Sequence, residues 1–382
     1  MLKSNIAWMK KNVPSDLKVW KGMIQDIDWQ QVAAKTKLSL QRDKDRITAE
    51  FKEFAAMDTS AKIDWLMNGD RHLGYLYKKD AIAFARREWK GLKSVGYDFV
   101  GWLKIWGGML NMVMKDPMSI MLAVFEYHWF ASYLATPAVV DRSVFGRRGK
   151  LLQADFDMWV AITHWAEDLI ANLIMADAKI GGNQKINKRI IMFDEMTMAQ
   201  MMAGFPNLLG IPYQMIPVFM VSEMDQLTLI PYIDAIESYG LPSDTCPLPT
   251  AECGCAVKDE YPMCGQGFIA SSMPCDGSVM ATSFQDRRFS KFMPSYPLCM
   301  PVRYDDEDTT EMAAADMKDC IHWVEGLTGE TWNWDTYFAT MEKMNECTRL
   351  EMEKWEINKT HYPQLVGSSF ELFRKWNYEM DG

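Results

Sequence analysis

The segment GFIASSMPCDG, residues 267–277, joins a short apolar run to a Pro-Cys-Asp-Gly turn. A run of this length bounded by glycine and proline predicts a buried β-strand. The expected strand, residues 267–272, therefore ends just before Cys275. Strand, turn and thiol follow one another here without an intervening loop, and this junction indicates both the fold and the site.

Three further segments have the same strand character: RIIMF at 189–193, YQMIPVFMV at 213–221 and YPLCMPV at 296–302. Helical patterns lie between and after them, at residues 196–209, at 222–240 with Ser222 as N-cap and Gly240 as the end, and at 309–327. This alternation predicts an α/β fold with an open parallel, Rossmann-like sheet flanked by helices. In such sheets, sites collect at the carboxyl ends of strands, where Cys275 is expected.

The part of the chain before this alternation has a different pattern. From Lys18 to Lys179, apolar residues recur every three or four positions, which predicts a mostly helical region. The turn-rich run AKIGGNQKINK, residues 178–188, ends it. We therefore expect a helical N-terminal region (1–185), an α/β domain (186–330) and a helical segment (331–382).

Composition limits the class of protein. The chain has 382 residues, 48% of them hydrophobic, which is enough to bury sizeable cores. Its opening, MLKSNIAWMKKNVPSDLK, lacks the apolar core of a secretory signal, so we expect a cytoplasmic protein with reduced cysteines. The formal net charge of −10 disfavours a nucleic-acid-binding surface.

One segment, Met118 to Val140, is long enough to cross a bilayer. Glu126 and His128 lie near its middle, where a carboxylate costs about 2.5–3.5 kcal/mol on insertion scales. We therefore expect a buried or interfacial helix, not a membrane span. Aromatic residues in this half are candidate anchors for a partner subunit, with packing inside the N-terminal region as the alternative. They are Trp102, Trp106, Trp129 and Phe130.

Thiols are concentrated around the 267–272 strand. Five of the eight cysteines lie within thirty residues: Cys246, Cys253, Cys255, Cys264 and Cys275. Thiolates on irregular backbone bind zinc or iron–sulfur clusters. Structural zinc sites pair cysteines two to four residues apart, and only Cys253 and Cys255 are close, so zinc is disfavoured. The other three, Cys299, Cys320 and Cys347, lie in strand or helix patterns, where we expect packing.

The order of these features resembles that of a known family. A helix ending in Tyr-Gly precedes Ser-Asp-Thr-Cys at 243–246, and a strand then closes on Pro-Cys-Asp-Gly-Ser at 274–278. The next strand leads to Pro-Val-Arg-Tyr at 301–304 and an acidic helix. In these respects residues 186–382 resemble the first α/β domain of large subunits of the 2-hydroxyacyl-CoA dehydratase and benzoyl-CoA reductase family. The long helical N-terminal region departs from that pattern, and so does the lack of a second α/β domain.

The resemblance implies an oxygen-sensitive subunit that holds a 4Fe-4S cluster and passes single electrons to an acyl-CoA. It makes Cys246 the first cluster ligand and Cys275 the second. The family's third cysteine belongs to a later domain, so here it would be absent, come from another chain, or be replaced by Cys253, Cys255 or Cys264. Dehydration of a 2-hydroxyacyl-CoA and reduction of an aromatic ring both stay open. A scaffold subunit without a cluster is the alternative.

Three arginines and the lack of a nucleotide-binding motif lead to expectations about the substrate and the partners. Arg287, Arg288 and Arg303 are candidate ligands for the phosphates of CoA, because a guanidinium fork suits phosphate. A solvated helix face or ion pairs with the acidic run 305–308 is the alternative, and this run is expected at the start of the following helix. The sequence has no Walker A loop, so we expect no nucleotide in this chain. A separate ATP-dependent iron–sulfur activator and a related dehydratase or reductase subunit are then the implied partners.

Overall fold

The structure, a computed structural model, describes residues 52–68, 92–136, 150–194, 199–224, 226–241, 246–272, 275–299, 301, 306–359 and 361. The chain forms two compact units. One takes the residues up to Met175 together with Lys179–Gly182, and the other takes Ala176–Ala178 and the residues from Asn183 onward. Among the described helices, none is long and apolar enough to cross a membrane.

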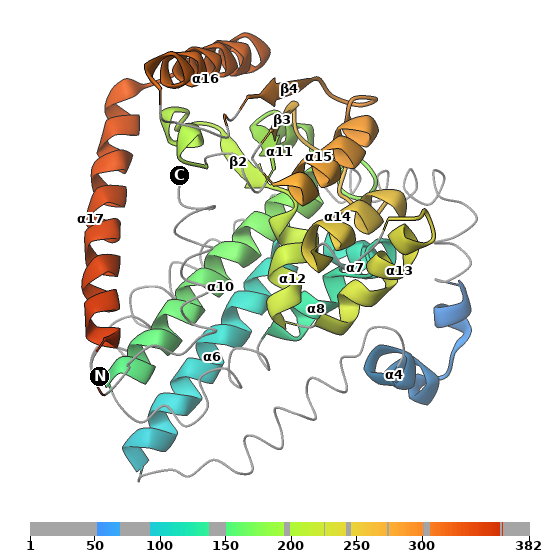
Figure 1. Ribbon diagram of the computed structural model, residues 1–382. Helices are drawn as coiled ribbons and strands as arrows, with labels where there is room; N and C mark the ends of the chain where they lie inside the picture. The colour runs from blue at the N-terminus through green and yellow to red at the C-terminus, as the bar shows by residue number, and fades with distance from the viewer. Residues whose placement is uncertain are drawn as a thin grey trace. The chain divides into compact units, whose positions relative to one another are not determined.

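Helices make up the described part of the first unit, as the sequence predicted (Figure 1). They are α4 (Thr59–Asn68), α6 (Leu92–Lys115), α7 (Pro117–Glu126), α8 (Phe130–Leu134) and α10 (Lys150–Ala176). Asp116 caps α7 by accepting a hydrogen bond from the Ser119 N–H, and Pro117 follows at the first helical position. The helical pattern expected before residue 52 lies outside the described residues.

The prediction of a single helix over residues 118–140 is wrong. The chain leaves helical geometry at Tyr127, whose backbone is extended, and α8 starts only at Phe130. Aromatic rings fill the break: Trp129 stacks on Tyr127 with ring centroids 5.2 Å apart. The end of the predicted segment, residues 137–140, lies outside the described part of the chain.

Two of the four aromatic residues expected to anchor a partner are interior. Trp129 and Phe130 have no exposed surface, and their rings pack on each other edge to face. A side chain without exposed surface cannot contact another chain, so the interface prediction is wrong for these two and packing is their role. Trp106 is half-buried, and the side chain of Trp102 lies outside the described residues.

Four parallel strands form the sheet of the second unit, and the predicted α/β fold is confirmed. They are β1 (Ile190–Phe193), β2 (Leu209–Pro212), β3 (Gly267–Ser271) and β4 (Ser295–Leu298), in the order β2-β1-β3-β4. Every residue of the central strands β1 and β3 is buried. Such continuous burial is expected where helices cover both faces of a parallel sheet.

Helices and helical turns connect these strands. In chain order they are α11 (Gln184–Asn187), η1 (Ala199–Gly204), η2 (Met215–Phe219), α12 (Met220–Met224), η3 (Gln226–Leu229), α13 (Ile230–Glu237), α14 (Pro247–Val257), α15 (Asp276–Phe289), α16 (Glu307–Thr328) and α17 (Trp334–Asn358). Ile191 and Ile269 of the sheet share one core with Val324 of α16 and Trp332. Phe268 points to the other face, against Phe289 of α15.

The expected strand at 213–221 is wrong. The strand is β2, which ends at Pro212, and the apolar run after it forms a turn, the π-helix η2 and the start of α12. An apolar run of this length fits a buried strand or a buried helix equally well, so its pattern could not decide. The helix expected at 222–240 is likewise divided into α12, η3 and α13, and Ser222 lies inside α12, where its hydroxyl donates to the Phe219 carbonyl.

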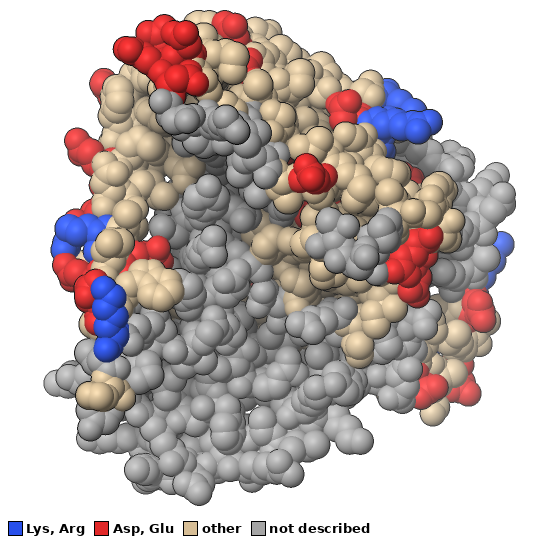
Figure 2. All heavy atoms as spheres, in the orientation of Figure 1, with Lys and Arg blue, Asp and Glu red and all other residues tan. Residues whose placement is uncertain are grey.

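The helix expected at 309–327 is confirmed as α16. Asp306 caps it by accepting from the Thr309 N–H, and Glu307 and Asp308 occupy its first turn, as predicted for the acidic run. The helix ends at Gly329, whose φ of 77° lies in the left-handed region that glycine tolerates. Asp and Glu side chains gather over α16 and along α17 on the face shown in Figure 2.

Candidate functional site

A buried carboxylate fixes the carboxyl edge of the sheet. Asp194 directly follows β1 and is 1% exposed. It accepts hydrogen bonds from the Ser271 N–H and hydroxyl at the end of β3, and from the Thr282 hydroxyl of α15 at 3.3 Å. These bonds tie the ends of two strands to the helix that follows them. Sequence reasoning missed Asp194, although its place directly after the buried run at 189–193 was a usable signal.

Cys246 and Cys275 occupy equivalent positions on two neighbouring helices. Cys246 is the N-cap of α14 and Cys275 the N-cap of α15, both with extended backbone and half-buried side chains. The first turns of the helices touch: a Cβ added at Gly277 would lie 2.9 Å from Cγ of Pro249 and 3.9 Å from Sγ of Cys275. The structure therefore brings together the two helix starts that carry these thiols.

The other three clustered cysteines are placed differently. Cys253 and Cys255 lie inside α14 and are fully buried, and Cys253 packs against Ile236 and Ala281. Burial, with Glu252 as a smaller cause, raises the pKa of Cys253 to about 12, so its thiol stays protonated. These two side chains are sealed in the helix interface rather than gathered at the helix starts.

Cys264 lies at the opposite edge of the sheet from Cys275. It precedes β3, and the next residues are bound at the beginning of β1, where the Gln266 N–H donates to the Ile190 carbonyl. Its sulfur is 3.8 Å from the sulfur of Met192, and burial raises the pKa of its thiol. The structure thus does not bring Cys264 to Cys275, which is four residues beyond the other end of the strand.

Two of the three candidate arginines, Arg287 and Arg288, lie in the last turn of α15, at the other end of the helix from Cys275. Arg287 is exposed in the last turn of the helix. Arg288 forms an ion pair with Asp259, and its guanidinium donates to the Tyr261 carbonyl at 3.0 Å. Its charge is therefore engaged in tying α15 to the loop after α14. Arg303 lies outside the described residues.

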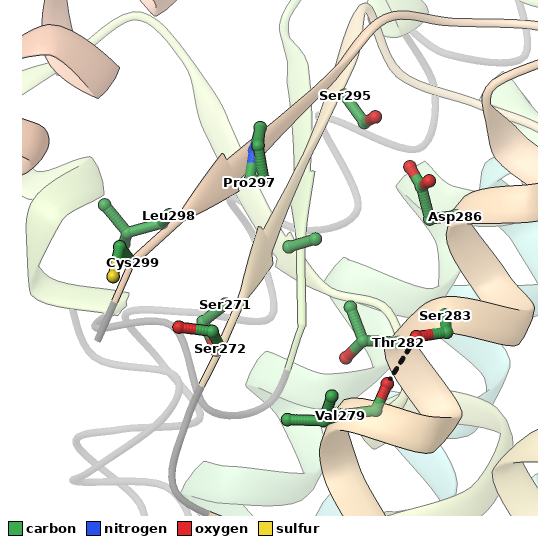
Figure 3. A pocket seen from close by; sticks show the side chains of 11 residues that line it. Ser271, Ser272, Val279, Thr282, Ser283, Asp286, Ser295, Pro297, Leu298 and Cys299 are labelled. Carbon is green, nitrogen blue, oxygen red and sulfur yellow. Dashed lines mark hydrogen bonds between the residues drawn. The ribbon is translucent and has the colours of Figure 1, made fainter. Parts of the chain in front are cut away.

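A pocket of about 450 Å³ with a mostly apolar lining surface lies between β3, β4 and α15 (Figure 3). Hydroxyl groups from Ser271, Ser272, Thr282, Ser283 and Ser295 line it, together with Asp286 and Cys299. No basic side chain belongs to this lining, as far as the described residues show. Three of these hydroxyls already donate, those of Ser271 and Thr282 to Asp194 and that of Ser283 to the Val279 carbonyl. With the Asp286 carboxylate in its wall, the pocket does not suit a phosphate.

The expected packing role is wrong for Cys299 and confirmed for Cys320. Cys320 is fully buried in α16, whereas Cys299 is exposed directly after the last residue of β4. The same rule that selected Cys275, a thiol following a strand, applies to Cys299. Sequence reasoning missed it because the expected fourth strand ran through residue 302 and enclosed it.

The positions of the thiols suit an iron–sulfur cluster better than a single metal ion. In the described ranges, no three His, Cys, Asp or Glu side chains converge closely enough to hold a single metal ion. Cys246 and Cys275 nevertheless fit an iron–sulfur cluster, whose ligands are thiolates bound to different iron atoms. Cys275 stands at a helix start whose free N–H groups favour an anion. The start of α14 beside Cys246 offers fewer such groups, because Pro247 and Pro249 have no N–H.

A second buried ionisable group lies in the first unit. Glu167 of α10 is 4% exposed, and burial, strengthened by Asp168 and opposed by Lys115, raises its pKa to about 9. The α6 backbone approaches it closely at Gly108, where an added Cβ would clash with Oε2 of Glu167 and lie 2.8 Å from the His164 ring. His164 Nε2 is 2.9 Å from the Lys104 carbonyl. Glu167 and His164 of α10 thus pack against the α6 backbone, and the Glu167 carboxyl is neutral at pH 7.

Comparison with known proteins places part of the chain. Residues 226–379 match the model of a family described as 2-hydroxyglutaryl-CoA dehydratase, D-component. The match includes β3, β4 and both helix starts with Cys246 and Cys275. No curated protein and no solved structure matches the chain significantly. Over these residues the chain is therefore similar to the 2-hydroxyacyl-CoA dehydratase family, as the sequence features predicted.

Proposed function

We propose that this chain is a component of a 2-hydroxyacyl-CoA dehydratase and that Cys246 and Cys275 bind its 4Fe-4S cluster. The single observation that carries the proposal is the pair of cysteine N-caps on two helices whose first turns touch. Both cysteines lie within the segment that matches the dehydratase family. Chemistry and position thus point to the same edge of the sheet.

The residues around these thiols have the tasks of holding and sheltering the cluster. The first turn of α15 offers backbone N–H groups to its sulfur atoms, which influences its potential. The first turn of α14 offers fewer, because Pro247 and Pro249 have no N–H. Asp194 keeps the end of β3 and α15 in fixed relation, and so keeps Cys275 in place. Bound there, the cluster would supply a single electron at low potential to an acyl-CoA.

Other parts of the enzyme complete this function. We propose a related dehydratase subunit as a stable partner and an ATP-dependent iron–sulfur activator as a transient one, in an oxygen-free cytoplasm. The activator is needed because the sequence contains no nucleotide-binding loop of the Walker type. A cluster-free partner subunit with the same fold is the second candidate.

Iron and acid-labile sulfide analysis tests the proposal. We expect protein purified or reconstituted without oxygen to contain both, with an absorption that bleaches in air. A colourless chain without iron after reconstitution would reject the cluster and leave the scaffold function.

The electron balance then separates the two reactions. Loss of water from a 2-hydroxyacyl-CoA is redox-neutral, so the complete enzyme should turn over many substrate molecules per reducing equivalent. Reduction of an aromatic ring consumes reductant in proportion to product. Product measured against a limiting amount of reductant therefore distinguishes a dehydratase from a benzoyl-CoA reductase.

A further inference from the structure

We propose that Cys299 provides a third thiolate to the cluster that Cys246 and Cys275 bind. This inference rests on the proposed function, since it assumes the cluster. It differs from the sequence-based expectation, in which the third ligand came from another chain or from Cys253, Cys255 or Cys264.

Sheet topology places Cys299 at the right edge. Strands β3 and β4 are parallel neighbours, with Ser271 paired to Leu298. The Ser272 N–H donates to the Leu298 carbonyl at 3.0 Å, so Cys299 lies level with the residues that lead from β3 to Cys275. Carboxyl ends of parallel strands meet at one edge, and both thiols follow such ends.

The backbone of Cys299 is fixed while its side chain is exposed. Its N–H donates to Oδ2 of Asp316 at 2.6 Å, and the other oxygen of this carboxylate accepts from the Tyr296 hydroxyl at 2.7 Å. The thiol itself is free and exposed. A held backbone with an accessible thiol is what a ligand position requires, whereas the buried thiols of α14 would have to leave the core to bind metal.

The pocket between β3, β4 and α15 reaches from Cys299 to the beginning of α15. Figure 3 shows the sulfur of Cys299 at the end of β4, with Ser272 and Val279 also on the pocket wall. The Val279 N–H donates to the Cys275 carbonyl at 3.0 Å, so Val279 is one helical turn from Cys275. The pocket therefore extends from one thiol to the helix turn that begins at the other.

The chemistry of the cluster agrees with thiols spread around a space. Each thiolate of a 4Fe-4S cluster binds a different iron atom, so the ligands surround the cluster and do not meet at a point. This is consistent with three thiols at separate element ends in a region where no single-ion site is found among the described residues.

The test measures iron and sulfide per chain, and thiol labelling, in protein reconstituted without oxygen. We expect Cys299→Ser and Cys299→Ala to weaken cluster binding at least about tenfold, as removal of metal-site residues does, and so to lower the iron and sulfide per chain. Cys347→Ser, a half-buried thiol on α17, is the matched control and should keep full iron. Because Cys299 is exposed, both of its variants should melt at the wild-type temperature, which separates ligand loss from misfolding.

Labelling gives a second, independent readout. Iodoacetamide should modify Cys299 in the iron-free chain and spare it in the reconstituted chain, with peptide mass spectrometry identifying the site. Full iron in both Cys299 variants, or equal labelling with and without iron, overturns the inference while the proposed function stands. A wild-type chain that binds no iron overturns both.

Discussion

Cys264 and Cys275 are eleven residues apart in the sequence and flank opposite ends of strand β3, so one lies at the amino end of the sheet and the other at its carboxyl end. Cys264 comes before β3, is buried beside Met192, and has a raised pKa. Cys275 comes after β3, is half-buried, and starts a helix. The comparison shows that position relative to a strand, and not spacing between cysteines, separates candidate ligands from core residues.

The difference extends to other ionisable groups of the molecule. Cys253 and Glu167 are sealed between helices, and burial keeps both uncharged at neutral pH. Groups of this kind contribute to packing and resist ionisation. Cys246 and Cys275 begin helices and Cys299 follows a strand, and in all three places solvent can reach a thiolate.

The largest expected effect concerns the edge thiols. Cys246→Ser and Cys275→Ser should each weaken cluster binding at least about tenfold, since each removes an iron ligand. Cys264→Ser should retain the wild-type iron content because its thiol lies at the other edge. Iron and sulfide per folded chain decide this. Equal iron in all three variants would remove the distinction between the two edges.

The next effect concerns Glu167 and depends on pH. Its pKa of about 9 in the folded chain lies above the ordinary 4.5, so the folded state retains a proton that the unfolded state loses between these values. Stability should therefore fall as pH rises from about 4.5 to 9. Glu167→Gln, which cannot ionise, should be more stable than wild type by as much as about 6 kcal/mol at pH 9.

Denaturant unfolding at several pH values measures this gain. The two proteins should differ little at about pH 3, well below the ordinary pKa of 4.5, where the wild-type carboxyl is neutral in both states. Asp157→Asn, an exposed residue of the same helix, is the control and should show no comparable trend. A gain that is the same at every pH would show that the carboxyl is not sealed.

The smallest effect concerns the sealed thiols. Cys253→Ser introduces a hydroxyl among Ile236 and Ala281 and should cost about 1–3 kcal/mol of stability, since a buried polar group without a partner is unfavourable. The half-buried Cys347→Ser should cost less. Chemical denaturation of the iron-free chains compares them. If Cys253→Ser lost iron without losing stability, Cys253 would be a cluster ligand and not a core residue.

Much of the second unit could be predicted from local sequence. The strand at 267–272, the capped helix α16 with its glycine end, and the α/β class follow from periodicity, capping residues and turn residues that act over a few positions. The site was predictable where such a signal ended in a thiol, as at Cys275. Asp194 and Cys299 carried the same signal, but it was weaker because the limits of their strands were misplaced or the residue type was less conspicuous.

The sequence by itself determined the class of fold, the strand that leads to Cys275 and the limits of α16, because these depend on neighbouring residues. Tertiary structure decided which edge of the sheet each thiol reaches and that Trp129 and Phe130 are interior. It also decided that the run after β2 is helical from Met215 to Met224 and that Cys299 borders a pocket. These outcomes depend on strand order, crossovers and contacts between segments far apart in the chain, which a periodic pattern of apolar residues does not encode.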